Sequence, residues 1–209
     1  MPRGGQGNQG RLARRASTTP LLVLNRFREE LRLAVVHDDG GGAVAWSVRA
    51  EDVIMVLDKL DDAGVRHWVG GGWGVAALVG RQTREHRDLD LAVDAKDLER
   101  CWPVLGQLGY AAETDWLPVR MELRASGGRW VDVHPVHFDA GGHGRQPDLD
   151  GGHFDYPPAA FTMGSIGGRL VPCLSAQQQR QFRTGYQHRP QDIHDLAELD
   201  ALDGGPTPA

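Results

Sequence analysis

The sequence predicts an α/β (α+β) fold, a mixed sheet flanked by helices, with a small C-terminal helical region. Apolar residues recur at helical spacing in residues 51–63, which is typical of an amphipathic helix. Short apolar segments separated by glycine pairs, as at Gly127-Gly128 and Gly167-Gly168, predict hairpins. Alternation of such helices and strands favours a sheet with helices packed on it.

The first half of this fold is predicted element by element. The helix from residue 51 ends at Gly64, and residues 65–69 form a short buried strand. Gly70-Gly71-Gly72 is a turn that opens a helix over residues 73–79, closed by Gly80. A strand over 88–93 follows, and then a helix over 95–108 that Pro103 kinks or interrupts.

The second half contains two predicted hairpins and two helices. The hairpins pair residues 119–125 with 129–136 and residues 162–166 with 169–173. Between them, the Gly-, Asp- and His-rich residues 139–153 predict a long loop. Ser175 is a suitable N-cap for a helix that reaches residue 186, and Pro190 begins a last helix through residue 202.

Three segments are expected along the chain. Residues 1–49 form a low-complexity N-terminal extension, disordered because its Gly-, Gln- and Arg-rich start cannot bury enough apolar area, although 21–36 could form a short helix or strand. Residues 50–174 form the core, and 175–209 form the C-terminal helical region and tail.

Charge and composition restrict the partners. Residues 1–50 carry eight Arg against four acids, so within the net charge of −5 residues 51–209 carry −9. An acidic body disfavours nucleic acid and suits a small cationic substrate. Cys101 and Cys173 do not have the spacing of zinc-binding cysteines, and we expect both to be buried thiols. We expect a cytoplasmic protein without a signal peptide or membrane span.

Asp88 and Asp90 are the strongest chemical feature of the sequence. They stand at i and i+2 on an apolar strand and so project two carboxylates from one face, where a cation would fit between them. The alternative is a polar strand edge in which Arg84 and Arg87 neutralise the acids.

Three strings carry a resemblance to a known family: GGWGVAALVGRQTREHRDLDLAV, VDVHPVHFD and FRTGYQHRPQDIHDL. They resemble the lincosamide nucleotidyltransferases and, more remotely, the aminoglycoside 2''-nucleotidyltransferases, within the DNA polymerase β-like nucleotidyltransferase superfamily. The resemblance covers residues 51–200. It implies a polymerase β-like fold and Mg²⁺-dependent transfer of a nucleoside monophosphate, AMP from ATP or another nucleoside triphosphate, to a hydroxyl of a small antibiotic, releasing pyrophosphate.

The resemblance also assigns roles to residues. Asp88, Asp90 and Asp132 would hold Mg²⁺, which carboxylates bind well, and Asp132 would also accept the proton of the acceptor hydroxyl. The residues expected to contact the nucleotide are Gly71, Gly72, Thr83, Arg84, Arg183 and Tyr186. Asp192 and Asp195 would line the nucleotide or acceptor side.

Two residues depart from the family pattern. Ala76 stands where relatives often carry an acid, and Gly70 stands where lincosamide enzymes often carry Asp. Both departures concern the acceptor pocket rather than the metal site.

Other functions remain open at this point. The same fold could belong to a nucleotidylating toxin or regulator acting on tRNA or protein, or to a degenerate nucleotide-binding module. A zinc site at His134, His137, His143 and His153 is disfavoured because no zinc-site spacing is present. The expected partners are a nucleoside triphosphate, a small antibiotic and, from the resemblance, a second copy of the chain.

Overall fold

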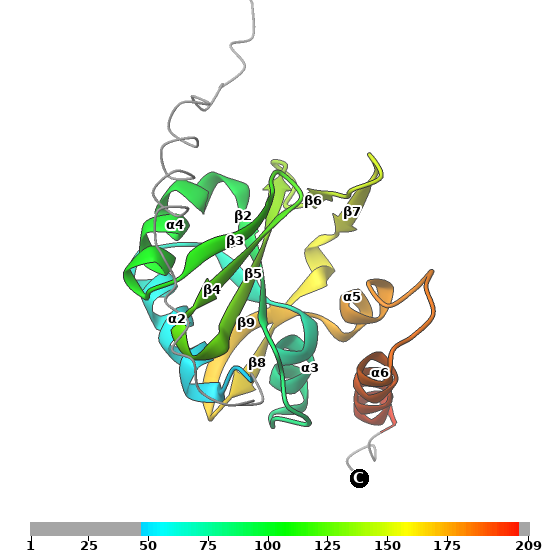
Figure 1. Cartoon of the computed structure of the whole chain (residues 1–209). Helices are drawn as coiled ribbons and strands as arrows, with labels where there is room; N and C mark the ends of the chain where they lie inside the picture. Colours follow the sequence, from blue (N-terminus) through cyan, green and yellow to red (C-terminus); the bar gives the residue numbers. More distant parts are fainter. Residues whose placement is uncertain (1–46, 205–209) are drawn as a thin grey trace, which may run out of the picture.

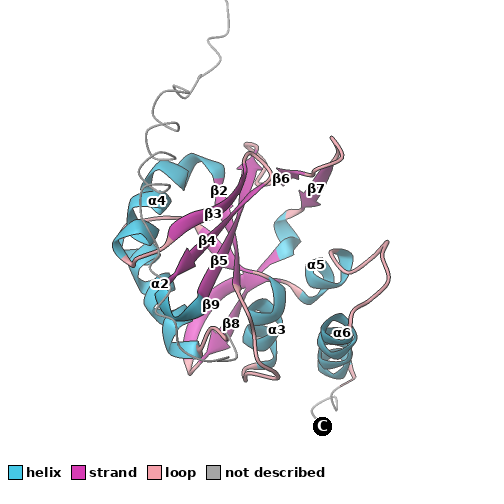
Figure 2. Ribbon diagram, in the orientation of Figure 1, coloured by secondary structure: helices cyan, strands magenta, loops and turns pink. Residues whose placement is uncertain are grey.

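The computed structural model describes residues 47–204 (Figures 1 and 2). Expectations for residues 1–46, including the element over 21–36, lie outside the described residues. The helices are α2 (Ala50–Asp62), α3 (Gly71–Val79), α4 (Leu98–Gln107), α5 (Ala176–Gln181) and α6 (Pro190–Asp203). The strands are β1 (His67–Val69), β2 (Leu89–Asp94), β3 (Ala111–Trp116), β4 (Arg120–Ala125), β5 (Arg129–Phe138), β6 (Gly144–Pro147), β7 (His153–Tyr156), β8 (Phe161–Ile166) and β9 (Arg169–Leu174).

The strands form one mixed sheet in the order β3-β4-β5-β2-β1-β9-β8, from which β6 and β7 extend beyond the end of β5. β2 runs parallel to β5 and antiparallel to β1. Figure 1 shows α2 and α4 along one side of the sheet and α3, α5 and α6 gathered on the other. The α/β fold with a mixed sheet flanked by helices is therefore confirmed.

Alternation along the central strands separates an apolar face from a polar one. Leu89 and Leu91 of β2 and Val131 and Val133 of β5 are buried in the main hydrophobic core. Because successive side chains on a strand point to opposite faces, Asp90 of β2 projects from the other face. A smaller apolar cluster, built around Ala92, Val136, Tyr156, Ala160 and Leu174, occupies that second face. The site forms on this side of the sheet.

Helix α3 is held close to the sheet at both of its ends. The Gly70 N–H donates to the Asp90 carbonyl at 2.9 Å, which attaches the start of the helix to β2. Further along, a Cβ on Gly164 of β8 would lie 2.5 Å from the Ala77 carbonyl oxygen. The missing side chain at Gly164 thus lets α3 approach β8 directly, and this contact fixes where the N-terminus of α3 points.

Most of the predicted elements are confirmed, and four predictions need correction. The hairpins β4–β5 and β8–β9, the helices α2, α3 and α6, and the Ser175 N-cap are present. Residues 139–153 are not one loop, because β6 and the start of β7 form a polar hairpin there. β3 was not predicted at all. Helix α5 ends at Gln181, five residues before the expected end.

The fourth correction concerns the helix around Pro103. Pro103 lies inside α4, and the interruption falls earlier, where a 3-10 turn (Ala95–Asp97) precedes the helix. Asp94 accepts the Lys96 N–H at 3.0 Å, and Asp97 accepts the Arg66 N–H at 2.9 Å. These carboxylate contacts stabilise the separate first turn and set the break.

One further prediction is confirmed by burial, since Cys101 and Cys173 are free, buried thiols. Trp73 is 1% exposed and belongs to the hydrophobic core. Among the described residues, no helix has the length and apolar character needed to cross a membrane.

Gly164→Ala should destabilise the protein by about 1–3 kcal/mol, because backbone atoms of Ala77 leave no space for a methyl group. Urea unfolding measures the change. Gly141→Ala is the matched control, since its Cβ would meet only Asp139 Oδ1 at an ordinary 3.4 Å. Equal stability of the two variants would contradict the close α3–β8 contact.

Candidate active site

Asp90, Asp132 and His134 come together at the centre of the sheet. Parallel pairing of β2 with β5 sets Asp90 opposite Asp132, and Ala92 opposite His134. Since alternate residues share a face, the three side chains lie on the same side. His134 Nε2 is 3.3 Å from Asp90 Oδ1 and 3.6 Å from Asp132 Oδ2. Within residues 47–204 this is the only cluster of three or more possible metal ligands.

Asp132 combines burial with one free oxygen atom. Arg120 Nη1 donates to its Oδ2 at 2.6 Å, whereas its Oδ1 is buried without a hydrogen-bond partner. Burial raises the pKa of Asp132 to about 6; His134 and Arg120 oppose this shift, and the charge of Asp90 adds to it. Asp132 can therefore change protonation near neutral pH, and its Oδ1 is free to contact a cation or a hydroxyl proton.

Asp90 is held in the charged form. Burial opposes its ionisation, but the hydrogen bond from His134 and the positive charges of Arg183 and Arg120 outweigh burial and lower its pKa. Its carboxylate lies against Gly71, whose φ is +55° and where any Cβ would collide with Asp90 Oδ2. Only glycine satisfies both conditions, so Gly71 brings the N-terminus of α3 against the Asp90 carboxylate.

Asp88 does not join this group. It precedes β2, and the Arg87 guanidinium donates to its Oδ2 at 2.7 Å. Burial and the nearby charge of Asp90 raise the pKa of Asp88, although Arg87 and Arg84 oppose the shift. The sequence analysis considered neutralisation of the acids by Arg84 and Arg87, and Arg87 does pair with Asp88. A bound cation would offset the negative charge of Asp90 beside Asp88.

A cleft lies beside the acids, between the sheet and the C-terminal helical region. Its lining combines the Gly70–Gly71 turn, Asp90 and His134 with polar and aromatic residues of β6, β7 and the α5–α6 segment. These include Gln146, Phe154, Tyr156, Phe182, Arg183, Tyr186, Arg189 and Asp192. Asp132 borders Asp90 and His134 but is not part of the lining.

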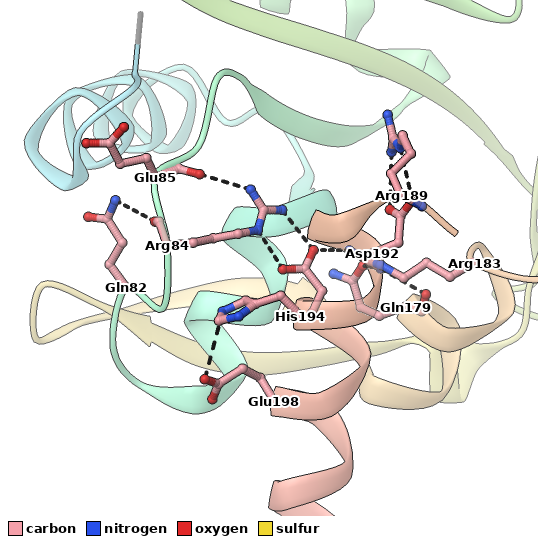
Figure 3. A network of polar contacts seen from close by, with 10 residues as sticks. Gln82, Arg84, Glu85, Gln179, Arg183, Arg189, Asp192, His194 and Glu198 are labelled. Carbon is pink, nitrogen blue, oxygen red and sulfur yellow. Dashed lines mark hydrogen bonds and ion pairs between the residues drawn. The ribbon is translucent and has the colours of Figure 1, made fainter. Parts of the chain in front are cut away.

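Two arginines converge on Asp195 of α6, which is 1% exposed. Arg84 donates to it through Nε and Nη2, both at 2.8 Å, and Arg183 donates through Nη2 at 2.7 Å. Burial opposes the Asp195 charge, but both arginines outweigh burial and lower its pKa. Figure 3 shows Arg84 and Arg183 within the surrounding polar network.

These contacts give the two arginines different roles. Arg84 Nη1 also donates to the Glu85 carbonyl at 3.0 Å, so every guanidinium nitrogen of Arg84 has a partner. Arg183 Nη1 donates to Gln179, but its Nε is buried without a partner, and Arg183 lines the cleft. Arg84 therefore attaches the preceding loop to α6, whereas Arg183 keeps a donor for a ligand.

The other residues expected to contact the nucleotide are distributed unevenly. Tyr186 lines the cleft and is 45% exposed. Gly72 lies beside His86 and Arg84 instead. Thr83 is outside the lining, and its Oγ1 is buried without a partner. His86 packs on Trp73 and is neutral, since burial and the Arg84 charge lower its pKa to about 4.

The two residues that depart from the family pattern, Ala76 and Gly70, lie in different parts of the structure. Ala76 is 1% exposed, packs in the hydrophobic core and is not part of the cleft lining. Gly70 does line the cleft. A side chain there would meet Leu174 and Asp90, so its absence widens the cleft beside the acids.

Sequence reasoning missed several residues around the acids. His134 could have been found, because it stands two residues after Asp132 on a predicted strand and so shares its face. Arg120 and Gln146 carried no such signal, since tertiary packing alone brings them to the site. Of the four histidines considered for zinc, only His134 belongs to a possible ligand group among the described residues.

Comparison with known proteins identifies the family of this chain. A sequence model of the aminoglycoside-2''-adenylyltransferase family matches residues 52–199. A lincosamide resistance protein of Staphylococcus haemolyticus is 32% identical over 156 residues, which cover 75% of this chain and 97% of that protein. A 2''-aminoglycoside nucleotidyltransferase of Klebsiella pneumoniae is 37% identical over 55 residues, which cover 25% of this chain and 31% of that protein.

Solved structures give the same fold. A lincomycin-bound lincosamide antibiotic adenylyltransferase superposes with a TM-score of 0.69 and 32% identity, covering 75% of this chain and 99% of the other. An aminoglycoside enzyme, ANT(2'')-Ia in complex with adenylyl-2''-tobramycin, superposes with a TM-score of 0.60 at 19% identity, over 75% and 89% of the two chains. The chain therefore belongs to the aminoglycoside-2''-adenylyltransferase family of antibiotic nucleotidyltransferases.

Proposed function

We propose that this enzyme transfers AMP from ATP to a hydroxyl of a lincosamide antibiotic, with Mg²⁺, and releases pyrophosphate. The observation that carries the proposal is the Asp90–Asp132 pair, in which Asp132 Oδ1 is buried and has no partner. A buried carboxylate oxygen without a partner is costly unless a ligand supplies one. Family membership supports nucleotidyl transfer as the reaction that uses it.

The residues present fit a divalent cation. Carboxylate oxygens are the ligands that Mg²⁺ prefers, and Asp90, Asp132 and Asp88 would supply them. When bound, Mg²⁺ would neutralise the triphosphate charge at the α-phosphorus and at the leaving pyrophosphate. Burial, and after it the charge of Asp90, raises the pKa values of Asp88 and Asp132, and a bound cation would stabilise both carboxylates.

Asp132 is the proposed general base. Its Oδ1 accepts the proton of the acceptor hydroxyl, whose oxygen forms a bond to the α-phosphorus while the bond to pyrophosphate breaks. Arg120 holds the other oxygen at 2.6 Å and so orients the carboxylate. A pKa of about 6 suits this step, because the group is ionised at neutral pH yet remains basic enough to accept a proton.

The start of α3 and Arg183 would hold the triphosphate. Gly71 and Gly72 belong to the first turn of α3, where free N–H groups and the helix dipole favour phosphate oxygens. Arg183 adds its unpartnered Nε, and Tyr186 offers a ring at the cleft edge. Arg84 acts through its ion pair with Asp195 and through its charge beside Gly72.

A lincosamide is the proposed acceptor, in preference to an aminoglycoside. Aromatic residues Phe154, Tyr156, Phe182 and Tyr186 line the cleft, which suits an acceptor with an apolar part. The full-length match to the lincosamide resistance protein favours the same class.

Asp132→Asn should lower kcat by about 10²–10⁴, because an amide cannot accept the hydroxyl proton. Release of pyrophosphate in the presence of ATP, Mg²⁺ and lincomycin measures the loss. Glu113→Gln, the same change at an exposed acid of β3, is the control and should retain activity. An active Asp132→Asn variant would remove the proposed base.

Activity should fall on the acid side of about pH 6. Burial raises the pKa of Asp132 to about 6, so protonation removes the base below that pH, and kcat/KM should drop roughly tenfold per unit. More Mg²⁺ should move this acid limb to lower pH, because the cation stabilises the carboxylate. A rate that stays constant down to about pH 4 at low Mg²⁺ would contradict the assignment.

Lincomycin should gain one AMP, visible as a mass increase, whereas tobramycin should react at least about 10-fold more slowly as judged by kcat/KM. Phe182→Ala should raise KM for lincomycin more than for ATP, since the ring contributes acceptor packing. Faster modification of tobramycin would assign the other acceptor class to this cleft. No product with either class would count against the proposed function.

A further inference from the structure

Gln146 connects the acid group to the β6–β7 hairpin. Its Nε2 lies 3.2 Å from the Val119 carbonyl oxygen and 3.1 Å from His134 Nδ1. Its Oε1 accepts a hydrogen bond from the Tyr156 hydroxyl. Gln146 and Tyr156 are 5% and 2% exposed, so these bonds form with little access to solvent. Each lost bond would leave a buried polar group without a partner.

The Val119 carbonyl decides which way the amide of Gln146 points. A backbone carbonyl can only accept a hydrogen bond, so the side of Gln146 that faces it must be the NH₂ group. The same NH₂ group faces His134 Nδ1, and its second hydrogen is directed to that nitrogen. His134 Nδ1 is therefore an acceptor, which means that it carries no proton.

We propose that Gln146 is a positioning residue that holds His134 as the Nε2–H tautomer, so that His134 donates to Asp90 and leaves metal binding to the carboxylates. The statement about metal binding rests on the proposed function. The position of the proton on His134 does not, because it follows from the hydrogen bonds of the protein itself.

The Nε2–H tautomer determines which carboxylate oxygens of Asp90 and Asp132 are available to a cation. A protonated Nε2 has no lone pair for a metal ion, so His134 is excluded as a ligand in this arrangement. Its N–H, 3.3 Å from Asp90 Oδ1, occupies that oxygen, and Arg120 occupies Asp132 Oδ2. Asp90 Oδ2, against Gly71, and Asp132 Oδ1 remain for the cation. Gln146 thus acts on the site through His134.

The first test locates the proton in the metal-free wild-type protein. Long-range ¹H–¹⁵N spectra of histidine-labelled protein at about pH 8 separate a protonated ring nitrogen from an unprotonated one, and His134→Gln assigns the signal. We expect a protonated Nε2 and an unprotonated Nδ1. Exposed His137 on the same strand is the internal control and should show averaged nitrogens. A protonated Nδ1 on His134 overturns the inference.

The second test removes the amide. Gln146→Leu keeps the bulk of the side chain, so we expect the His134 Nδ1 signal to shift because this nitrogen loses its hydrogen-bond donor, and we expect a kcat about tenfold lower, with KM for lincomycin changed less than kcat. Tyr156→Phe removes only the hydroxyl, leaves the Val119 contact and should preserve the Nε2–H tautomer. An unchanged His134 spectrum in folded Gln146→Leu overturns the role of Gln146.

The third test asks whether His134 binds the metal, with Mn²⁺ as the probe in the presence of a non-hydrolysable ATP analogue. His134→Gln keeps an N–H near the position of Nε2, so Mn²⁺ affinity should fall by less than about tenfold, well below the loss in Asp90→Asn. Equal losses would make His134 a ligand and overturn the proposal. Absence of Mn²⁺ binding in the wild type, with the expected tautomer, would overturn the proposed function alone.

Discussion

The parallel register of β2 with β5 is the constraint on which the site depends. It sets Asp90 opposite Asp132 and Ala92 opposite His134, and strands in such a pair lie about 4.8 Å apart. A slip of β2 by one residue would turn Asp90 into the hydrophobic core and bring Leu89 and Leu91 to the polar face. The apolar face therefore enforces the register, and the register brings two like charges together at a cost the protein must offset.

That cost is offset by arginines and a hydrogen-bond donor from neighbouring parts of the fold. Arg120 comes from β4, and His134 from β5 itself. Arg183 comes from the segment after α5 and is itself held by Asp195 of α6. These contacts lower the pKa of Asp90 but leave Asp132 Oδ1 without a partner. This unpartnered oxygen is the atom at which the proposed chemistry takes place. Its burial without a partner lowers stability, and the proposed function explains why it is retained.

Elements with a clear local pattern were predictable, and polar edge elements were not. The β4–β5 and β8–β9 hairpins have apolar alternation around glycine turns. β3 and the β6–β7 hairpin consist largely of polar residues, since they lie at an edge or away from the main sheet, and no periodicity marks them. The missed hairpin carries Gln146 and Tyr156, so the contacts that orient His134 were missed with it.

The sequence by itself determined the α/β class and the order of most elements, because strand alternation and glycine turns are local properties of the chain. Its resemblance to antibiotic nucleotidyltransferases indicated the family and named Asp88, Asp90 and Asp132 as candidate metal ligands. Only the tertiary structure decided which of these residues meet. It separated Asp88, paired with Arg87, from the Asp90–Asp132–His134 group, and it attached Arg84 to Asp195 while leaving Arg183 a free donor. The hydrogen-bond partners are residues distant in the chain. Burial by those residues, together with their charges, determines the direction of each pKa shift.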